Sequence, residues 1–340
     1  MNKFIHICPD EKFISAAISQ FTEVDKENHL FIIISKKKKL DFLKDERYII
    51  LTPLKLYFYM ILNFNELKNK IIVLHSAKKY SKIATLLSPS KCKIVWIGFG
   101  YDYYNEPSPK KHKKYIEKAF LKRIDFFSPV LTNEIKIVKS KYPYFKAKLL
   151  DWNYDVVSFF WKKDIPKMSD SILLGNSATE TNNHFEIITL LNKIKEKKKI
   201  ILPLSYGSNL YKDKILDILN QSNLNTQPLL DYINIEDYYN IISGCSHVIM
   251  NHDRQQAYGN IMILLYSGSK LFLKKQNPLY TYLSESGFII YTIDELQYEI
   301  KSRLTKECIM HNRELALSLY SRINFLNRTR RFIKTIEKND

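Results

Sequence analysis

The sequence is poor in residues and motifs that identify several common classes of protein. Its 340 residues include only 8 glycines, and neither G-x-G-x-x-G after the first apolar run nor G-x-x-x-x-G-K-[ST] occurs. This excludes a dinucleotide fingerprint and a P-loop. No D-x-D pair is present either, which argues against a diphosphate bridged by a metal ion. We therefore expect neither a metal nor a cofactor.

Cysteine is equally scarce. Its four residues are far apart in the chain, at Cys8, Cys92, Cys245 and Cys308. No CxxC pair indicates a zinc site, and the density is too low for a disulfide framework. We interpret all four as reduced thiols in the core.

Long apolar runs are missing as well. No stretch approaches the roughly 20 uninterrupted apolar residues that a membrane-spanning helix needs. The nearest, LKLYFYMILNF from Leu54 to Phe64, contains Lys55 and Asn63, so it predicts a buried or interfacial helix. The N-terminal residues MNKFIHICPDEKF lack the apolar segment of a signal peptide, and we expect the protein to stay in the cytoplasm.

Acidic residues are outnumbered by basic ones. The chain has 53 lysines and arginines against 35 aspartates and glutamates, a net charge of +18. Such a charge favours an anionic partner, which could be nucleic acid, an anionic membrane or a phosphorylated substrate. Charge alone does not choose among the three.

The sequence does contain a regular alternation of short β-branched runs with longer amphipathic stretches, which is typical of βαβ units. The first five runs are residues 4–7, 31–34, 48–51, 71–75 and 94–98. After DIPKMSD at 164–170, five more follow at 172–176, 199–203, 247–250, 270–273 and 288–292. We predict an α/β protein of two parallel-sheet, Rossmann-like domains, 1–165 and 170–308. A helical tail, 309–340, would pack back toward the first domain.

A polar cluster, HDRQQAYGN from His252 to Asn260, interrupts the second half where a strand leads into a helix. Ligands bind at such places in open α/β sheets, because helix N-terminal amides and the carboxyl ends of strands face one crevice. Two Rossmann-like halves with this cluster form the layout of a GT-B glycosyltransferase, whose two domains face each other across a cleft. The C-terminal half would then hold a nucleotide sugar and the N-terminal half an acceptor.

Several short stretches match a known family in order along nearly the whole chain. They are Ile5-His6, His75 at a strand end, W-x-x-x-G-x-D-x-Y at 96–104, GNS at 175–177 followed by Asn183-His184, P-x-x-Y at 203–206, RQQ at 254–256 with Gly259, and Asn277-Pro278. On these residues the chain resembles glycosyltransferase family 56, the fucosaminyltransferases of enterobacterial common antigen synthesis. The resemblance implies transfer of 4-acetamido-4,6-dideoxygalactose from a dTDP donor to a polyprenyl-diphosphate-linked disaccharide. Three positions depart from the family pattern, where glycine, a small hydroxyl residue and histidine are expected: Ala257, Asn260 and Ile97.

An inverting transfer needs a base for the acceptor hydroxyl and groups that stabilise the departing diphosphate. In the N-terminal half, His6, His75 and Asp102 lie at predicted strand ends or in the loop that follows. Asp102, in the loop GFGYDYY, is our first candidate for the base, although it could equally cap the following helix. His6 and His75 are further candidates, with a buried structural role as the alternative.

The candidate donor-binding residues of the C-terminal half are Gly175, Asn176, Ser177, Tyr206, Arg254, Gln255, Gln256, Gly259 and Asn260. Arg254 would neutralise diphosphate charge, and the glutamines would hydrogen-bond phosphate or sugar hydroxyls. The GNS segment suits a phosphate or ribose, and Tyr206 could stack on the base. The alternatives are helix caps, a surface salt bridge and simple packing of the tyrosine.

The segment at 109–127 predicts a basic amphipathic helix. Its apolar stripe is Ile116, Phe120, Ile124 and Phe127. The remaining surface carries six lysines, Lys110, Lys111, Lys113, Lys114, Lys118 and Lys122. Such a helix suits an anionic membrane surface or a lipid diphosphate, although the stripe could simply be core.

The sequence therefore favours an inverting, metal-independent glycosyltransferase, peripheral on the cytoplasmic face of the inner membrane. Its partners would be a nucleotide diphosphate sugar and a polyprenyl-diphosphate-linked glycan, and we expect no nucleic acid. One alternative is a basic nucleic-acid-binding protein, motivated by the charge and by 23 tyrosines and 19 phenylalanines that could stack on bases, although no nucleic-acid-binding motif is present. The other is a GT-B-like sugar-nucleotide epimerase.

Overall fold

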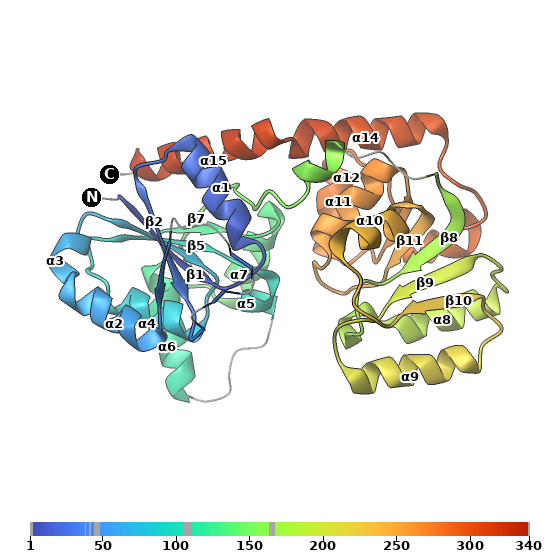
Figure 1. Cartoon of the computed structure of the whole chain (residues 1–340), viewed down its shortest axis with the longest axis horizontal. Helices are drawn as coiled ribbons and strands as arrows, with labels where there is room; N and C mark the ends of the chain where they lie inside the picture. The colour runs from blue at the N-terminus through green and yellow to red at the C-terminus, as the bar shows by residue number, and fades with distance from the viewer. Residues whose placement is uncertain are drawn as a thin grey trace. The chain divides into compact units, whose positions relative to one another are not determined.

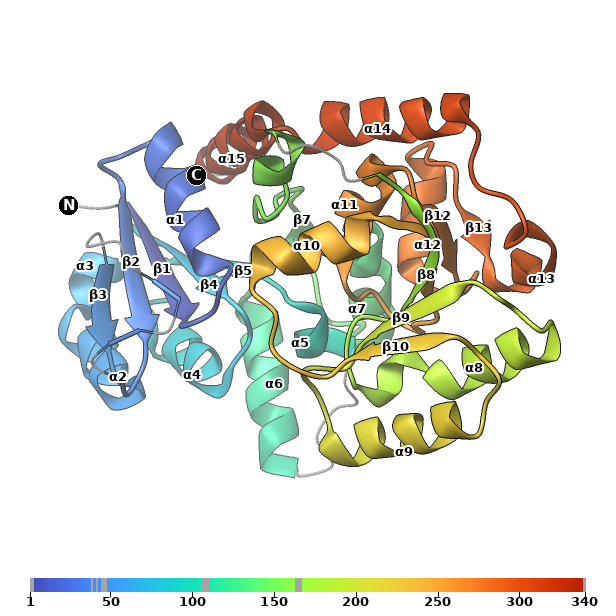
Figure 2. The same ribbon diagram turned by 45° about the vertical axis from the view of Figure 1, so that its right-hand side comes forward.

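The computed structural model describes residues 3–37, 39–40, 42–43, 48–104, 111–162 and 167–338. The chain divides into two compact units, each with a parallel sheet between layers of helices (Figures 1 and 2). Unit 1 comprises Met1–Val156 and Arg322–Asp340, and unit 2 comprises Val157–Ser321. The predicted pair of parallel-sheet α/β domains is confirmed. The divisions after Val156 and Ser321 differ from the predicted boundaries at 165–170 and 308–309.

The described part of unit 1 contains a seven-stranded sheet in the order β3-β2-β1-β4-β5-β6-β7. Every pair of neighbouring strands is parallel. The strands are β1 (Phe4–Pro9), β2 (His29–Ile34), β3 (Tyr48–Leu51), β4 (Ile71–His75), β5 (Lys93–Ile97), β6 (Phe126–Ser128) and β7 (Lys148–Leu149). Because helices cover both faces, the central strands are buried apolar runs. The strand order reverses between β1 and β4, so the loops after these two strands diverge.

Two layers of helices enclose this sheet. On one face α1 (Ile14–Val24) packs against α15 (Arg322–Glu337), and on the other α2 (Pro53–Leu62), α4 (Lys79–Leu87) and α6 (Lys111–Arg123) follow one another (Figures 1 and 2). The shorter helices of the unit are α3 (Phe64–Leu67), α5 (Gly100–Tyr104), η1 (Thr132–Glu134) and α7 (Ile135–Lys141). The core accordingly has two parts, one on each side of the sheet.

In the described residues of unit 2, six parallel strands form a sheet in the order β10-β9-β8-β11-β12-β13. They are β8 (Ser169–Leu174), β9 (Lys199–Pro203), β10 (Thr226–Leu229), β11 (Cys245–Met250), β12 (Lys270–Leu273) and β13 (Tyr291–Thr292). The helices are η2 (Ser158–Lys162), η3 (Glu180–Asn182), α8 (His184–Lys193), α9 (Asn209–Asn220), α10 (Ile235–Ser243), α11 (Tyr258–Ser267), α12 (Pro278–Glu285), η4 (Ile293–Glu295), α13 (Leu296–Glu299) and α14 (Lys306–Tyr320). Here the strand order reverses between β8 and β11.

Two helix predictions need correction. The basic helix predicted over 109–127 ends at Arg123, and Phe127 belongs to β6. Phe120, Ile124 and Phe127 are buried while Ile116 is partly exposed, so the apolar stripe is mainly core. The C-terminal segment is two helices that meet at Ser321, one in each unit. No helix in the described ranges is long and apolar enough to cross a bilayer.

The cysteines fit their predicted role in part. All four are free; Cys8, Cys92 and Cys245 are buried, and Cys308 is half-buried. Burial raises the pKa of the Cys92 and Cys245 thiols to about 11, which keeps them protonated at neutral pH. These buried thiols therefore act as small apolar core residues.

The last helix is tied to unit 1 by a buried hydrogen bond. Trp152 Nε1 donates to Thr329 Oγ1 over 2.9 Å, and both side chains are buried. At the start of α15, the Arg322 guanidinium binds Asp155 at 3.1 Å and also contacts Glu23. The Trp152–Thr329 bond, the packing of Phe332 and the partly buried Arg322–Asp155 pair together anchor α15, whereas the exposed contact with Glu23 contributes little.

We predict that Thr329→Val lowers the free energy of unfolding by about 1–3 kcal/mol, because the buried Trp152 N–H loses its acceptor while the side-chain shape is kept. Thr22→Val is the matched control. Among the described residues, the Thr22 hydroxyl bonds only to carbonyls of its own helix α1, and we expect a change within about 0.5 kcal/mol. Urea unfolding followed by tryptophan fluorescence measures both. Equal losses in the two variants would show that the Trp152–Thr329 bond does not anchor α15.

Candidate functional site

The candidate donor site of unit 2 lies where the strand order reverses. β8 and β11 are neighbours in the sheet, yet the chain continues from β8 to β9 and from β11 to β12. The loops after these two strands therefore diverge at the carboxyl edge of the sheet, which is where ligands bind in open α/β proteins. These loops carry the GNS segment at 175–177 and the RQQ segment at 254–256.

Three of the predicted residues are joined by direct hydrogen bonds. The Asn176 side chain donates to the Tyr206 hydroxyl and accepts from Gln256 Nε2, each over 3.0 Å. Gln256 also accepts from the Thr181 hydroxyl at 2.8 Å. The Tyr206 side chain is 60% exposed, so its ring is available for stacking. One polar network thus connects the loops that follow β8, β9 and β11.

Asn182, which the sequence did not single out, is the centre of this region. Its Oδ1 accepts from the Asn176 backbone N–H at 2.9 Å and from His252 Nε2 at 2.8 Å. Its amide group donates to Thr179 Oγ1 at 2.8 Å and to Ser177 Oγ at 3.1 Å. Ser177 is buried, and its hydroxyl is engaged within the loop. Ser177 therefore shapes the loop through side-chain contacts with Asn182 and Thr179, and its donor-binding role stays a prediction.

Gly175 allows the loop after β8 to pack against these residues. Its φ is +69°, and a Cβ at this position would lie 2.5 Å from His184 Nε2 and 2.8 Å from Asn182 Oδ1. Any side chain would therefore strain the backbone and displace the network. In a chain with only 8 glycines, this one is required by geometry.

Asn277 fixes the loop after β11. Its amide donates to the carbonyls of His252 and Arg254 at 2.9 and 3.0 Å. Its Oδ1 accepts from the Leu279 N–H at 2.9 Å and so caps α12. Arg254 is half-buried and Gln255 is buried. The backbone of the RQQ segment is therefore positioned by a buried asparagine that the sequence marked only as part of the family pattern.

The start of α11 shows why the family pattern has glycine at position 257. Ala257 has φ 57° and ψ 26°, a left-handed conformation that costs a non-glycine residue about 1–2 kcal/mol. The glycine expected at this position would avoid that cost. Gly259 lies in the first turn of α11, which follows the loop after β11, and N–H groups in the first turn of a helix have no acceptor within that helix. Asn260 donates to the Tyr238 hydroxyl at 3.1 Å, so its side chain is tied to α10.

Two buried histidines beside the network are neutral at physiological pH. Burial lowers the pKa of His184 to about 4, and burial with the charges of its neighbours lowers the pKa of His252 to about 3. His184 Nε2 and His252 Nδ1 have no hydrogen-bond partner within the described residues. Unpaired buried nitrogens are costly, so both are polar groups that a ligand or water could satisfy.

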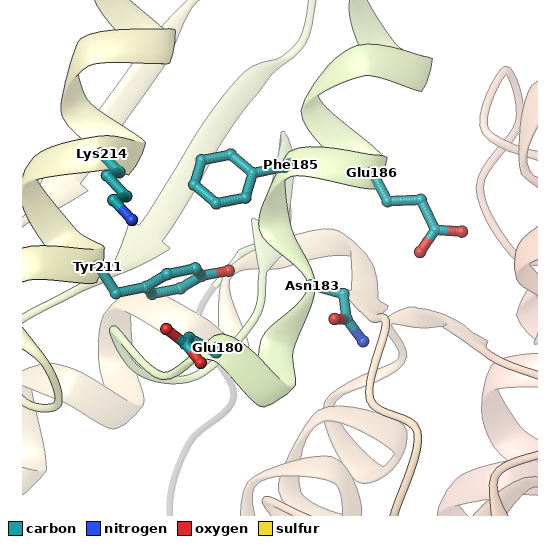
Figure 3. Close-up of a pocket in the computed structure, with 6 residues that line it drawn as sticks. All are labelled: Glu180, Asn183, Phe185, Glu186, Tyr211 and Lys214. Atoms are coloured by element: carbon teal, nitrogen blue, oxygen red, sulfur yellow. The ribbon is translucent and has the colours of Figure 1, made fainter.

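A pocket of about 370 Å³ lies near this site between α8 and α9 (Figure 3). Its lining residues are Glu180, Asn183, Phe185, Glu186, Tyr211 and Lys214. None of the predicted donor-binding residues lines it. Asn183 links the pocket to the loop after β11, because its amide donates to the Asn251 carbonyl at 3.0 Å and to Asp253 at 2.9 Å.

In unit 1, Asp102 lies in the first turn of α5, just beyond β5. Its carboxylate accepts from the Phe99 N–H and the Ser76 hydroxyl, each at 3.0 Å, and from Trp96 Nε1 at 3.4 Å. The bond to Phe99 braces the start of Asp102's own helix, because the predicted loop at 98–104 is helical from Gly100. Asp102 therefore does not precede and cap a following helix as the alternative supposed. Burial raises the pKa of Asp102, and its hydrogen bonds oppose the rise. Through Ser76, which contacts the Tyr101 hydroxyl at 2.8 Å, the carboxylate is connected to an exposed residue.

Two residues that the sequence did not identify hold the segment around Asp102 in place. Ser76 follows β4 directly and has φ 99°, a strained conformation of the kind that clusters at functional sites. Glu134 is fully buried and accepts from the Tyr103 hydroxyl at 2.7 Å and from the Tyr104 hydroxyl. The two tyrosines directly follow Asp102 in α5, so Glu134 holds this helix in place through their hydroxyls.

His6 and His75 belong to a buried chain of rings. His6 Nδ1 lies 3.0 Å from His75 Nε2, and His6 Nε2 lies 2.9 Å from His29 Nδ1. His75 Nδ1 lies 2.8 Å from the Tyr154 hydroxyl. Burial lowers the pKa of His6 well below its ordinary value and that of His75 to about 3. The predicted strand-end position is wrong for His6, because β1 continues to Pro9. It is correct for His75, although that side chain is fully buried.

The lysines of α6 are described in part. Lys114, Lys118 and Lys122 are exposed. Lys110 and the side chains of Lys111 and Lys113 lie outside the described residues. Throughout the described ranges, no group of three or more His, Cys, Asp or Glu is arranged so that it could hold a metal ion.

Solved glycosyltransferases share this fold. HepE of Anabaena, crystallised with UDP-glucose, aligns with a TM-score of 0.72 at 10% identity over 98% of this chain and 99% of that chain. A glycosyltransferase from Rickettsia africae aligns over both whole chains with a TM-score of 0.67 at 14% identity. Sucrose-phosphate synthase from Thermosynechococcus elongatus does so with a TM-score of 0.66 at 8% identity. The predicted GT-B fold is therefore confirmed.

The family follows from the sequence itself. Residues 24–335 match the family described as 4-alpha-L-fucosyltransferase glycosyl transferase group 56. Because the match spans most of both units, the chain belongs to glycosyltransferase group 56. The protein is a glycosyltransferase, and the resemblance noted from its short motifs is confirmed at the level of the family. The nucleic-acid-binding and epimerase alternatives lose their support.

We predict that Gly175→Ala destabilises unit 2 by more than about 1 kcal/mol, because it combines a left-handed backbone with close contacts to His184 and Asn182. The control is Gly244→Ala in the same unit. There the nearest atoms to a new Cβ lie 3.5 Å away and φ is −79°, so we expect a change within about 0.5 kcal/mol. Thermal unfolding compares the two. The same melting temperature in both variants would mean that the loop after β8 adapts freely.

Proposed function

We propose that the protein is an inverting, metal-independent glycosyltransferase that moves a 4-acetamido-4,6-dideoxy hexose from a dTDP donor to a polyprenyl-diphosphate-linked oligosaccharide. The product would enter the synthesis of a bacterial surface polysaccharide, such as O-antigen, capsule or common antigen. Work on the cytoplasmic face of the inner membrane is part of the proposal, since a polyprenyl-linked acceptor is anchored in a bilayer.

The single observation that carries the proposal is the Asn176–Gln256–Tyr206 network at the strand-order reversal of unit 2. It brings together three segments that the family pattern identifies separately. Tyr206 would stack on the nucleotide base, and Arg254 would pair with the diphosphate as a charge-assisted partner. The first-turn amides of α11 would support the same anionic group. These protein groups supply the positive charge that a bridging metal supplies in other enzymes.

Asp102 is the proposed base in unit 1. A carboxylate whose pKa is raised by burial is a stronger proton acceptor than an exposed one. Its contact through Ser76 with the exposed Tyr101 gives it a hydrogen-bonded route to a hydroxyl at the surface. The neutral histidines His6 and His75 are buried, and we assign them to support of the β1–β4 edge.

The donor nucleotide is testable by ligand-induced stabilisation. We predict that dTDP raises the melting temperature of the purified protein and that magnesium is not required, because binding to the native state alone stabilises it. UDP, GDP, CMP and a short oligonucleotide are the comparison ligands. HepE was crystallised with UDP-glucose, so a preference for UDP is the specific result that would replace dTDP. Stabilisation by the oligonucleotide alone would overturn the proposal.

The division of labour between the two units gives a second prediction. Arg254→Ala should weaken nucleotide-diphosphate binding about tenfold or more, because a charge-assisted partner is lost. Asp102→Asn should leave that binding intact and abolish transfer. In the wild type, activity should fall with decreasing pH as Asp102 is protonated. Its raised pKa places this loss at a higher pH than for an ordinary aspartate. Loss of nucleotide binding in both variants would refute these roles.

A further inference from the structure

An apolar surface on unit 1 is not explained by the folded core. Helix α2 buries Leu56 and Met60 against the sheet, yet its opposite side is apolar too. This outer side, the α2 apolar face, consists of Leu54, Phe58, Ile61 and Leu62, with exposed fractions of 63, 55, 54 and 81%. When two opposite sides of a helix are apolar, both are normally covered by protein or lipid, and clustered exposed apolar residues indicate a contact surface.

The surroundings of this face are basic. α2, α4 and α6 lie side by side in one layer (Figures 1 and 2). Exposed lysines in the described part of this layer are Lys55, Lys79, Lys114, Lys118 and Lys122. Glu117 is the one carboxylate in the sequences of the three helices, and it is paired with Lys82 at 3.2 Å. The layer therefore presents aliphatic side chains together with positive charge.

The aliphatic side chains and the positive charge together indicate which partner covers this surface. A second copy that packed through the same layer would bring exposed lysines against exposed lysines. The described parts of α2, α4 and α6 offer no exposed acid to pair with them, and Glu66 in α3, just beyond the end of α2, is a single exposed carboxylate against five exposed lysines. Nucleic acid would match the charge, but aliphatic leucine and isoleucine side chains do not stack on bases. An anionic lipid bilayer matches both, because its headgroups attract lysine and its acyl region accepts apolar side chains.

We propose that the α2 apolar face inserts into the headgroup and acyl boundary of an anionic membrane, while lysines of α4 and α6 bind the headgroups. The lysines of α6, taken alone, would give adsorption that salt reverses. The α2 face adds an apolar contribution that salt does not remove. As a route to the lipid-linked acceptor, this surface rests on the proposed function, but its contact with lipid can be measured separately.

The test is flotation of the full-length protein with vesicles of phosphatidylcholine, with and without phosphatidylglycerol. The wild type should float with the anionic vesicles. Phe58→Ser/Ile61→Ser/Leu62→Ser should reduce partitioning about tenfold or more, because each buried methylene contributes to binding. The matched control is Phe42→Ser/Leu149→Ser/Ile323→Ser, which removes the same three residue types from exposed positions elsewhere in unit 1. It should float as the wild type does.

A second readout separates insertion from adsorption. Phe58→Trp should show a blue shift of its emission when anionic vesicles are added, and Ile323→Trp should show none. Lys114→Glu/Lys118→Glu should lose the preference for anionic vesicles. Flotation of the α2 triple variant equal to that of the wild type would overturn the proposal. A dimer in solution that the same variant dissociates would also overturn it, since a second copy would then cover the face.

The same preparations are assayed for stabilisation by dTDP, which distinguishes the two proposals. Flotation through α2 without any response to nucleotides would refute the proposed function and leave the lipid contact standing. Stabilisation by dTDP, together with flotation that does not depend on α2, would support the proposed function and refute the lipid contact. Equal circular dichroism spectra of the two triple variants would confirm that neither result reflects unfolding.

Discussion

The candidate donor site depends on the hydrogen bonds of one buried side chain, Asn182. A parallel sheet whose strand order reverses leaves a gap at its carboxyl edge, because the loops on either side turn away from each other. Asn182 bridges that gap by accepting from the backbone of Asn176 and from His252. Gln256 adds a second bridge to Asn176. Breaking any of these buried hydrogen bonds would leave a polar group unpaired at a cost in free energy, so the loops are held in one arrangement. The residues exposed on these loops are therefore held in fixed positions as well.

The strands that the sequence predicts well are those buried on both faces. The runs at 71–75, 199–203 and 270–273 coincide with β4, β9 and β12, whose residues are almost all buried, as expected of continuous apolar runs in a parallel sheet. The run at 48–51 coincides with β3 as well, although Ile49 and Ile50 of this edge strand are exposed. β6, β7 and β10 were missed. β6 and β7 have only 3 and 2 residues, and β10 contains Pro228, which disfavours the prediction of a strand. Site residues with a chain-local signal, such as glycine or an RQQ cluster, could be found. Asn182, Ser76 and Glu134 could not, since their roles come from partners in other elements.

Histidine is the residue for which the sequence left two roles open, and its burial in the structure favours the structural one. His6 and His75 read as candidate bases, because the ordinary pKa of histidine lies near neutrality. In the structure, burial lowers the pKa of both rings, and their nitrogens are engaged with each other, with His29 and with Tyr154. His184 and His252 have the same character in unit 2. In both units, neutral buried histidines form hydrogen bonds between strands and loops. This structural role cannot be recognised from the spacing of residues in the sequence.

The net charge indicates a particular partner only when the exposure of apolar residues near the lysines is considered with it. A value of +18 is compatible with nucleic acid, with membrane and with phosphorylated substrate. The sequence placed the membrane contact on the lysines of α6, whose apolar stripe turns out to be core. Helix α2, on the other side of α4, supplies what α6 lacks, because its apolar side chains lie on the outside as well as the inside. Positive charge draws a protein to an anionic bilayer, but residence there is prolonged by apolar burial. The layer of α2, α4 and α6 contains both positive charge and exposed apolar side chains. Binding of a soluble nucleotide would require neither of these features on this layer.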